Sequence, residues 1–283
     1  MLKLKSLLAK YKLSILNGGK YPILTKISAD YKNKHEILHY PFDYKGCMQE
    51  EVGKHIADIY ESIEHKPNDE LVKEAYKQLE IELIKQFEFV KKRTDIKFEP
   101  YTGEGEPYSN SYEMLVDINN HHLYFFKTAS GFGETEYNEV NIMLKKTGVK
   151  IGKYELVVND LFRIVHDIFG HAMNGNGFGP IGEDNAWYDH LQMFSPLAAS
   201  ALSTETRGQN CWVNFGLHLR DKNNQLLKKG QKGWIQPSER PFAYQKMNIL
   251  PSYITGIEVY KDVGRVKAKY VNFWDPFLSI LNS

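Results

Sequence analysis

Residues 158–173, VNDLFRIVHDIFGHAM, carry the clearest structural pattern in the chain. Apolar residues recur there at helical spacing, and Asn159 or Asp160 can cap the start of the helix. Gly170 is expected to end it, because glycine tolerates the backbone conformations that follow a last helical turn. The stretch therefore predicts a helix that carries His166 near its C-terminus.

The two histidines of this stretch form a candidate metal platform. His166 and His171 are five residues apart, so an ideal α-helix would turn them about 140° away from each other. If the helix ends at Gly170, His171 can swing back toward His166. Asp167 lies four residues before His171 and can orient its ring or bind the metal directly. The alternative is a helix that ends in surface histidines.

A second apolar helix, expected to start at Ser195 and Pro196, offers a third ligand. Glu205 lies on its inward apolar stripe. A carboxylate in such a position is costly unless it is paired or bound to a metal. Two alternatives remain: Glu205 completes a site of two histidines and one carboxylate, or it forms a buried ion pair with Arg163.

The segment between these helices, residues 174–194, is first glycine-rich and then acidic and aromatic. In one interpretation it covers the metal, and Trp187 or Tyr188 stacks on an aromatic substrate or cofactor. The alternative is a helix that packs Trp187 into the core. Reserve ligands, should Glu205 not bind the metal, are Asp167, Glu183, Asp184, Asp189 and His190.

Only six of the 36 basic residues are arginines. In a lysine-dominated chain, an arginine is more often present for its planar, bidentate guanidinium group. Arg163 and Arg207 flank the candidate ligands, so we expect them to bind an acidic group of the substrate, with Asp167 as a third candidate catalytic residue. For Arg163, the alternative is an exposed ion pair with Asp167 that stabilises the helix by about 0.3–0.5 kcal/mol.

The remaining chain adds helices and a small β element. The expected elements are helices at 49–63 and 69–92, strands at 95–101, 111–118 and 122–128, a hairpin turn at Asn119-Asn120, and loops at 102–110 and 129–135. The sequence thus predicts an α+β fold, mainly α with a small antiparallel β element, as a single catalytic domain. Its expected parts are N-terminal helices and a β hairpin (1–158), metal-site helices (159–220) and a C-terminal segment (221–283).

Composition excludes several classes of protein. The chain is 42% hydrophobic and 25% charged, with a formal net charge of +1, which argues against a dedicated nucleic-acid binder. Two cysteines are too few for a disulfide scaffold or a cysteine zinc site, and no apolar run reaches the roughly 18 residues of a membrane span. We therefore expect a cytoplasmic protein that acts on a small molecule, without membrane or nucleic-acid partners. The oligomeric state stays open.

HDIFGH, read as His-Asp-x-x-Gly-His, resembles the iron-binding motif of the pterin-dependent aromatic amino acid hydroxylases. In that family the two histidines ligate iron, and a glutamate directly before Phe-Gly on a later helix completes the triad. The likeness covers residues 161–217 and implies that His166 and His171 bind Fe(II), with a tetrahydropterin as electron donor.

The chain departs from this family at two positions. Asn214 stands before Phe215, where the family has its glutamate, and Ala172 follows the second histidine, where the family has proline. The nearest carboxylate on the later helix is Glu205, which would take the role of the third ligand.

Three functions compete on these grounds. The first is a mononuclear non-haem iron monooxygenase, or hydroxylase, for a small substrate that is aromatic if the resemblance extends that far. The second is an HD-type metal-dependent phosphohydrolase, built on His166 and Asp167. It would need an earlier histidine and a later aspartate, drawn from His121, His122, Asp189 and Asp221. The third is a non-enzymatic protein in which these residues form a buried polar network.

Overall fold

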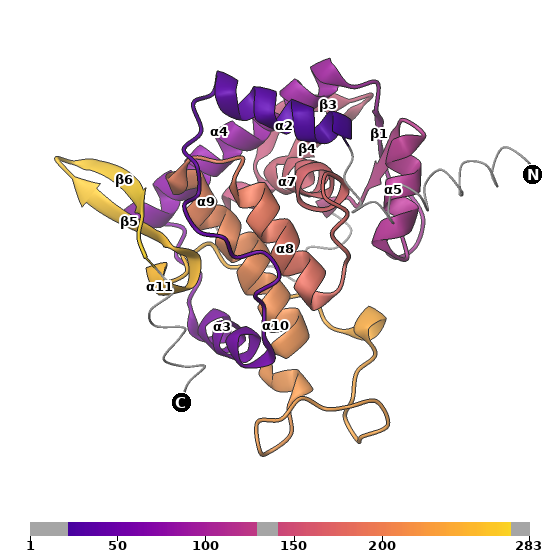
Figure 1. Cartoon of the computed structure of the whole chain (residues 1–283), viewed down its shortest axis with the longest axis vertical. Helices are drawn as coiled ribbons and strands as arrows, with labels where there is room; N and C mark the ends of the chain where they lie inside the picture. The colour runs from indigo at the N-terminus through magenta and orange to yellow at the C-terminus, as the bar shows by residue number, and fades with distance from the viewer. Residues whose placement is uncertain (1–21, 129–140, 273–283) are drawn as a thin grey trace, which may run out of the picture. The chain divides into compact units, whose positions relative to one another are not determined.

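The computed structural model describes residues 22–128 and 141–272 (Figure 1). These residues are mainly helical and contain three two-stranded sheets, so the α+β class predicted from the sequence is confirmed. They fall into two compact units. The first unit contains 22–38, 80–128 and 142–193, and the second contains 39–79, 141 and 194–272. The assignment of a single catalytic domain stays a prediction.

The first unit holds most of the short strands. Its helices are α2 (Pro22–Lys34), α5 (Ser111–Asn119), α7 (Val158–His166) and α8 (Pro180–Leu191), with the 3-10 turn η1 (Ile142–Leu144) and the π-helix η2 (Asp167–Ala172). Its strands are β1 (Lys97–Pro100), β2 (His122–Phe125), β3 (Lys146–Ile151) and β4 (Tyr154–Val157). Helix α8 packs against η2 (Figure 1), and this packing positions the candidate site.

The second unit combines helices with one hairpin. Its helices are α3 (Glu50–Ser62), α9 (Pro196–Ser203), the π-helix η3 (Thr204–Gly208), α10 (Gln209–Phe215) and α11 (Ser252–Thr255), with 3-10 turns η4 (Leu217–Leu219) and η5 (Pro237–Glu239). Its strands β5 (Ile257–Asp262) and β6 (Arg265–Tyr270) pair in antiparallel fashion. Helix α3 lies along α10 (Figure 1), and α9 packs against the hairpin.

Helix α4 (Glu70–Arg93) runs through both units and follows the pattern expected over residues 69–92. The Asp69 carboxylate accepts hydrogen bonds from the backbone N–H groups of Leu71 and Val72, at 2.9 and 3.1 Å. These bonds satisfy two of the donors that a helix start leaves unpaired. The helix expected at 49–63 is also confirmed, as α3.

The strand expected over residues 111–118 is wrong, because this segment forms helix α5. The Asn110 side chain accepts a hydrogen bond from Glu113 N at 3.0 Å, and the Glu113 carboxylate accepts one from Ser109 N at 2.9 Å. This reciprocal capping at a spacing of three residues favours a helix over a strand. Its buried side is formed by Met114, Leu115 and Ile118.

The hairpin expected at Asn119-Asn120 is wrong for the same reason. These residues end α5, and β1 pairs with β2 in parallel, with α5 on the connection between them. Parallel strands need such a crossover, whereas a tight turn joins only antiparallel ones. The antiparallel pairs are instead β3 with β4 and β5 with β6. The loop expected at 129–135 lies outside the described residues.

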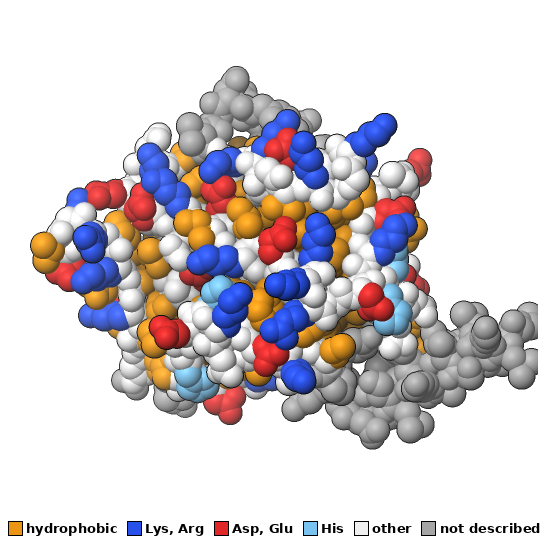
Figure 2. Space-filling view, turned by 90° about the horizontal axis from the view of Figure 1, so that it is seen from above, with side chains coloured by type: hydrophobic (Ala, Val, Ile, Leu, Met, Phe, Trp, Pro, Cys, Tyr) orange, Lys and Arg blue, Asp and Glu red, His pale blue; other side chains and the backbone are white. Residues whose placement is uncertain are grey.

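The surface carries charges of both signs. In Figure 2, Lys and Arg side chains are interspersed with Asp and Glu side chains over the visible face, as the balanced composition leads one to expect. Within residues 22–128 and 141–272, the helices are all too short or too polar to cross a lipid bilayer. The absence of nucleic-acid and membrane partners stays a prediction.

Candidate metal centre

The helix that carries the two histidines does not end at Gly170, so that expectation is wrong. Helix α7 continues from His166 into the π-helix η2, in which Met173 N donates to Ile168 O at 2.9 Å. A hydrogen bond between residues five apart widens the turn and brings such residues to one side of the helix. His171 therefore does return toward His166, and their ring centroids lie 5.0 Å apart.

Helix α7 also begins slightly earlier than predicted. Neither Asn159 nor Asp160 is its N-cap, since the helix starts at Val158. Asp160 lies in the first turn, where its carboxylate accepts a hydrogen bond from Val157 N at 3.0 Å. The same carboxylate accepts bonds from the backbone N–H and the hydroxyl of Thr128, so it stabilises the start of the helix and the end of the preceding segment together.

Gly170 has a steric role in this arrangement. A Cβ atom added at Gly170 would lie 2.9 Å from the Cε1 and Nδ1 atoms of His166 and 3.1 Å from Ala186 O. Contacts this short would displace the imidazole ring or helix α8. The glycine therefore allows the ring of His166 and the backbone of α8 to approach η2 closely.

We expect Gly170→Ala to disturb the site more than the fold. Overpacking of this kind costs about 1–3 kcal/mol, and displacement of His166 should lower metal affinity at least tenfold. Thermal unfolding and chelator competition measure the two effects. Gly179→Ala is the matched control, because a Cβ at Gly179 meets nothing within 4 Å. Equal metal affinities in both variants would contradict this role for Gly170.

Glu183, in the first turn of α8, directs its carboxylate to the two histidines. Its Oε2 atom lies 3.4 Å from His171 Nε2 and 3.9 Å from His166 Nε2. One ligand atom from each of the three residues lies within 4.8 Å of the others, and in the described part of the chain this is the group suited to hold a metal ion. Ligands about 2.1 Å from an ion are about 3–3.4 Å from each other. The three ligand atoms would therefore have to move only slightly closer together to hold a metal ion.

The glycine-rich segment before α8 brings Glu183 into place. A Cβ at Gly182 would lie 2.1 Å from Gly177 O, so the loop passes directly over the first turn of the helix. The Asn176 amide donates to Gly170 O at 2.7 Å and to Asp189 Oδ2 at 2.6 Å. These two bonds tie the loop to η2 on one side and to α8 on the other.

No family model, curated protein or solved structure matches this chain.

The charges within the group support one another. Burial lowers the pKa of His171, but the Glu183 carboxylate outweighs it and raises that pKa to about 9. Burial alone would raise the pKa of Glu183, yet His171 and His166 hold it well below its ordinary value. Burial also raises the pKa of the neighbouring Asp167 carboxyl to about 7. Glu183, whose carboxylate is held in its charged form by the cations beside it, is therefore a good partner for a metal.

Aromatic and charged side chains surround the three residues. Phe162 stacks on His166, with ring centroids 5.4 Å apart, and Phe178 meets His171 edge-on at 5.0 Å. The Arg163 guanidinium lies 5.4 Å from the centroid of the Phe126 ring and 3.9 Å from the nearest carboxylate oxygen of Glu106. The positive charge of Arg163 lowers the pKa values of both His166 and Asp167, and its role in substrate binding stays a prediction.

Glu205 belongs to the second unit and has different partners. Its carboxylate accepts hydrogen bonds from the Tyr76 hydroxyl, from Gln245 Nε2 at 2.7 Å and from Gln209 Nε2 at 2.8 Å. Burial raises its pKa to about 7. The expected ion pair with Arg163 is absent among the described residues, since Glu205 is held by neutral donors. The structure thus brings Glu183, and not Glu205, to the two histidines.

The other candidate residues divide between the units. Trp187 and Leu191 are fully buried, as the packing alternative for α8 requires, and Tyr188 is half-buried. Arg207 lies in the second unit, where it donates to Ile254 O and covers the Tyr44 ring at 4.2 Å. Their assigned roles in cofactor and substrate binding stay predictions.

The ligands that an HD-type phosphohydrolase would need make other contacts. His121 lies 2.6 Å from Asp95, and His122 lies 2.7 Å from Asp117. Asp189 accepts from Asn176, and the Asp221 carboxylate accepts from two backbone N–H groups of its own turn. In the described part of the chain, none of these joins the group of His166, His171 and Glu183.

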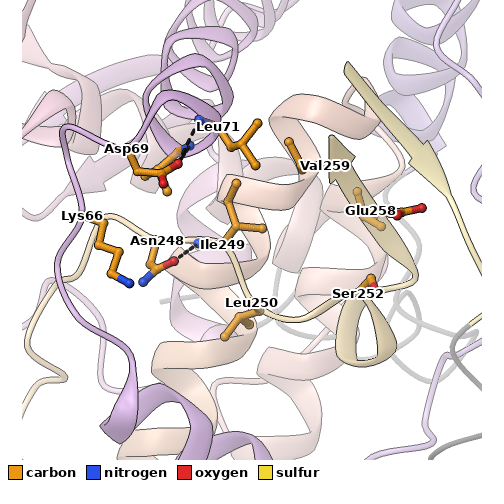
Figure 3. Close-up of a pocket in the computed structure, with 11 residues that line it drawn as sticks. Lys66, Asp69, Leu71, Asn248, Ile249, Leu250, Ser252, Glu258 and Val259 are labelled. Atoms are coloured by element: carbon orange, nitrogen blue, oxygen red, sulfur yellow. Dashed lines mark hydrogen bonds between the residues drawn. The ribbon is translucent and has the colours of Figure 1, made fainter. Parts of the chain in front are cut away.

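The second unit contains a cavity of about 330 Å³ between the start of α4 and strand β5 (Figure 3). Its polar lining includes Asp69, whose carboxylate caps α4, and Asn248, whose side chain accepts a hydrogen bond from Ile249 N. Asp69 and Asn248 thus use their side chains to stabilise the local backbone.

Proposed function

We propose that this protein is a mononuclear non-haem iron monooxygenase that hydroxylates a small aromatic substrate. The observation that carries the proposal is the meeting of His166, His171 and Glu183, with one ligand atom of each within 4.8 Å of the others. Two histidines and one carboxylate on one side of an octahedral ion leave positions for O2 and substrate, as in non-haem Fe(II) oxygenases. The resemblance of HDIFGH to a hydroxylase motif supports the same assignment.

A bound Fe(II) would supply the activation of O2, with electrons from a tetrahydropterin as the resemblance implies. The chain would bind and orient the substrate. Phe178 is 37% exposed beside the site and offers a ring for an aromatic substrate to stack on. Arg163 offers its guanidinium to an acidic group, and its 3.9 Å contact with Glu106 is long enough to be exchanged. Asp167, with a pKa of about 7, can take or give a proton near neutral pH.

A zinc hydrolase is the second candidate. Two histidines and one glutamate also hold catalytic zinc together with a water molecule. The 3.4 Å separation of Glu183 Oε2 and His171 Nε2 suits the wide angles of a tetrahedral site. This candidate predicts a different metal and no reaction with O2.

Metal analysis tests the proposed function. We expect protein purified without oxygen to bind one Fe(II), and the iron–nitric oxide complex to give the electron paramagnetic resonance signal of a site with open positions. His171→Ala should abolish both. His122→Ala is the matched control, because that histidine lies in the same unit but contacts Asp117 instead.

The iron proposal fails if one equivalent of zinc binds and Fe(II) does not displace it, and that outcome would favour the hydrolase. Lack of binding by either metal at micromolar concentration would contradict both candidates. Consumption of O2 in the presence of aromatic amino acids and a reduced pterin would extend the assignment to the substrate.

A further inference from the structure

A chain of buried hydrogen bonds lies behind His166, on the side away from Glu183. His166 Nδ1 lies 3.1 Å from His190 Nδ1, and His190 Nε2 lies 3.0 Å from Gln86 Oε1. Gln86 Nε2 donates to Met193 O at 3.1 Å. Gln86 and His190 are fully buried, and His166 is 8% exposed. This row of hydrogen bonds connects helices α4, α8 and α7 within the first unit.

The direction of each bond in this chain follows from its far end. The backbone carbonyl of Met193 can only accept, so the amide nitrogen of Gln86 must face it. The amide oxygen of Gln86 then faces His190 and can only accept, which places a proton on His190 Nε2.

The proton on His166 follows in turn. A neutral imidazole with its proton on Nε2 has a bare Nδ1, so His190 Nδ1 accepts from His166 Nδ1. A neutral His190 suits its burial, since a charged ring there would lose its hydration. The Nε2 atom of His166, which faces Glu183, is then left with its lone pair free.

We propose that Gln86, acting through His190, is a positioning residue that fixes the proton of His166 on Nδ1 and so keeps Nε2 ready to bind the metal. This inference rests on the proposed metal site. His171 is oriented differently, because its Nδ1 donates to the backbone carbonyl of Asn176 at 3.1 Å, and it must release the proton on Nε2 before that atom can bind a metal. One ligand is thus oriented by the backbone and the other by side chains, and partners of this kind strengthen metal binding.

Nitrogen-15 NMR of the metal-free protein tests the proton position directly. We expect His166 to carry its proton on Nδ1 alone, in wild-type protein at neutral pH. A proton on Nε2, or an even mixture of the two tautomers, would overturn the inference. This reading needs no bound metal and no activity, so it decides the inference even if the protein binds no iron.

Substitution of Gln86 tests the consequence for binding. Gln86→Met keeps the size of the side chain and removes both hydrogen bonds, so His166 should show mixed tautomers and the affinity for Co(II) should fall about 10–100-fold. Gln192→Met is the matched control, because the Gln192 side chain also donates to a backbone carbonyl in this unit, that of Tyr188, rather than to a histidine ring. Unchanged tautomer and affinity in Gln86→Met would overturn the inference.

The wild-type spectrum decides the question if Gln86→Met does not fold. If wild-type protein shows the expected tautomer but binds neither Fe(II) nor Co(II), the proposed function fails while the proton arrangement stands. The two failures are therefore distinguishable.

Discussion

Glu183→Gln is expected to lower the affinity for Fe(II) or Co(II) by more than about 100-fold. The substitution keeps the shape of the side chain but removes the negative charge that faces His166 and His171. Loss of an outer partner of a metal ligand already costs 10–100-fold in affinity, so loss of a ligand's charge should cost more. Competition with a chromophoric chelator measures the change, and circular dichroism checks that the fold is retained.

The matched control for this experiment is Glu205→Gln. Both residues are glutamates on helical segments. The sequence favours Glu205 as the ligand, whereas the structure groups Glu183 with the histidines. We expect Glu205→Gln to bind metal with wild-type affinity. The reverse result, with binding lost in Glu205→Gln and kept in Glu183→Gln, would contradict the assignment of the site.

Wild-type protein is expected to lose about 2–3 kcal/mol of stability between pH 5 and pH 8 through Glu205. Burial raises the pKa of this carboxyl from 4.5 to about 7 in the folded state, so the folded protein binds a proton that the unfolded chain releases. Stability from this group is therefore fully present below about pH 4.5 and is lost as the pH rises through 7. Urea unfolding of metal-free protein at several pH values measures the loss.

Glu205→Gln should remove this part of the pH dependence and leave the part that Asp167, whose pKa is also raised to about 7, contributes over the same range. The neutral amide can still accept from Tyr76 and Gln245, and it cannot ionise as the pH rises. Glu258→Gln serves as the control, because Glu258 is an exposed partner of Lys269 and should leave the slope unchanged. A slope in Glu205→Gln as steep as that of the wild type would show that another group is responsible.

The sequence predicted those elements whose signals are local. Asp69 stands directly before an apolar helical repeat, and α4 starts where expected. Ser195 and Pro196 mark the start of α9 in the same way, and the Ser195 hydroxyl accepts from Ala198 N. The capping pair Asn110 and Glu113 was an equally local signal, but the β-like run of apolar residues after it favoured a strand.

The π-helix could not be predicted, because its cause lies outside the segment. An extra residue in a helical turn is stable only where packing compensates for weaker hydrogen bonding. Here the backbone of α8 packs over Gly170, and Asn176 ties the loop back to it. Neither contact is visible from the spacing of His166 and His171.

The sequence favoured Glu205 as the third candidate ligand and kept Glu183 only in reserve, for a related reason. A buried carboxylate such as Glu205 is an obvious candidate when only helical stripes are considered. Glu183, however, lies four residues before Trp187, so on a helix that begins at Pro180 the two share one side. The spacing of Glu183 and Trp187 could therefore have indicated, from the sequence alone, a carboxylate that faces inward within 20 residues of the histidines.

The extra residue in η2 also decides whether the motif can be transplanted. A peptide of residues 158–176 in water would have no α8 to pack against and would favour ordinary α-helical turns, if it folded at all. Its two imidazoles would then point about 140° apart and could not chelate one ion. The HDIFGH segment thus cannot chelate a metal ion outside its own fold, whereas a helix with histidines four residues apart can. Grafting it onto a designed scaffold would require the overlying helix and loop as well.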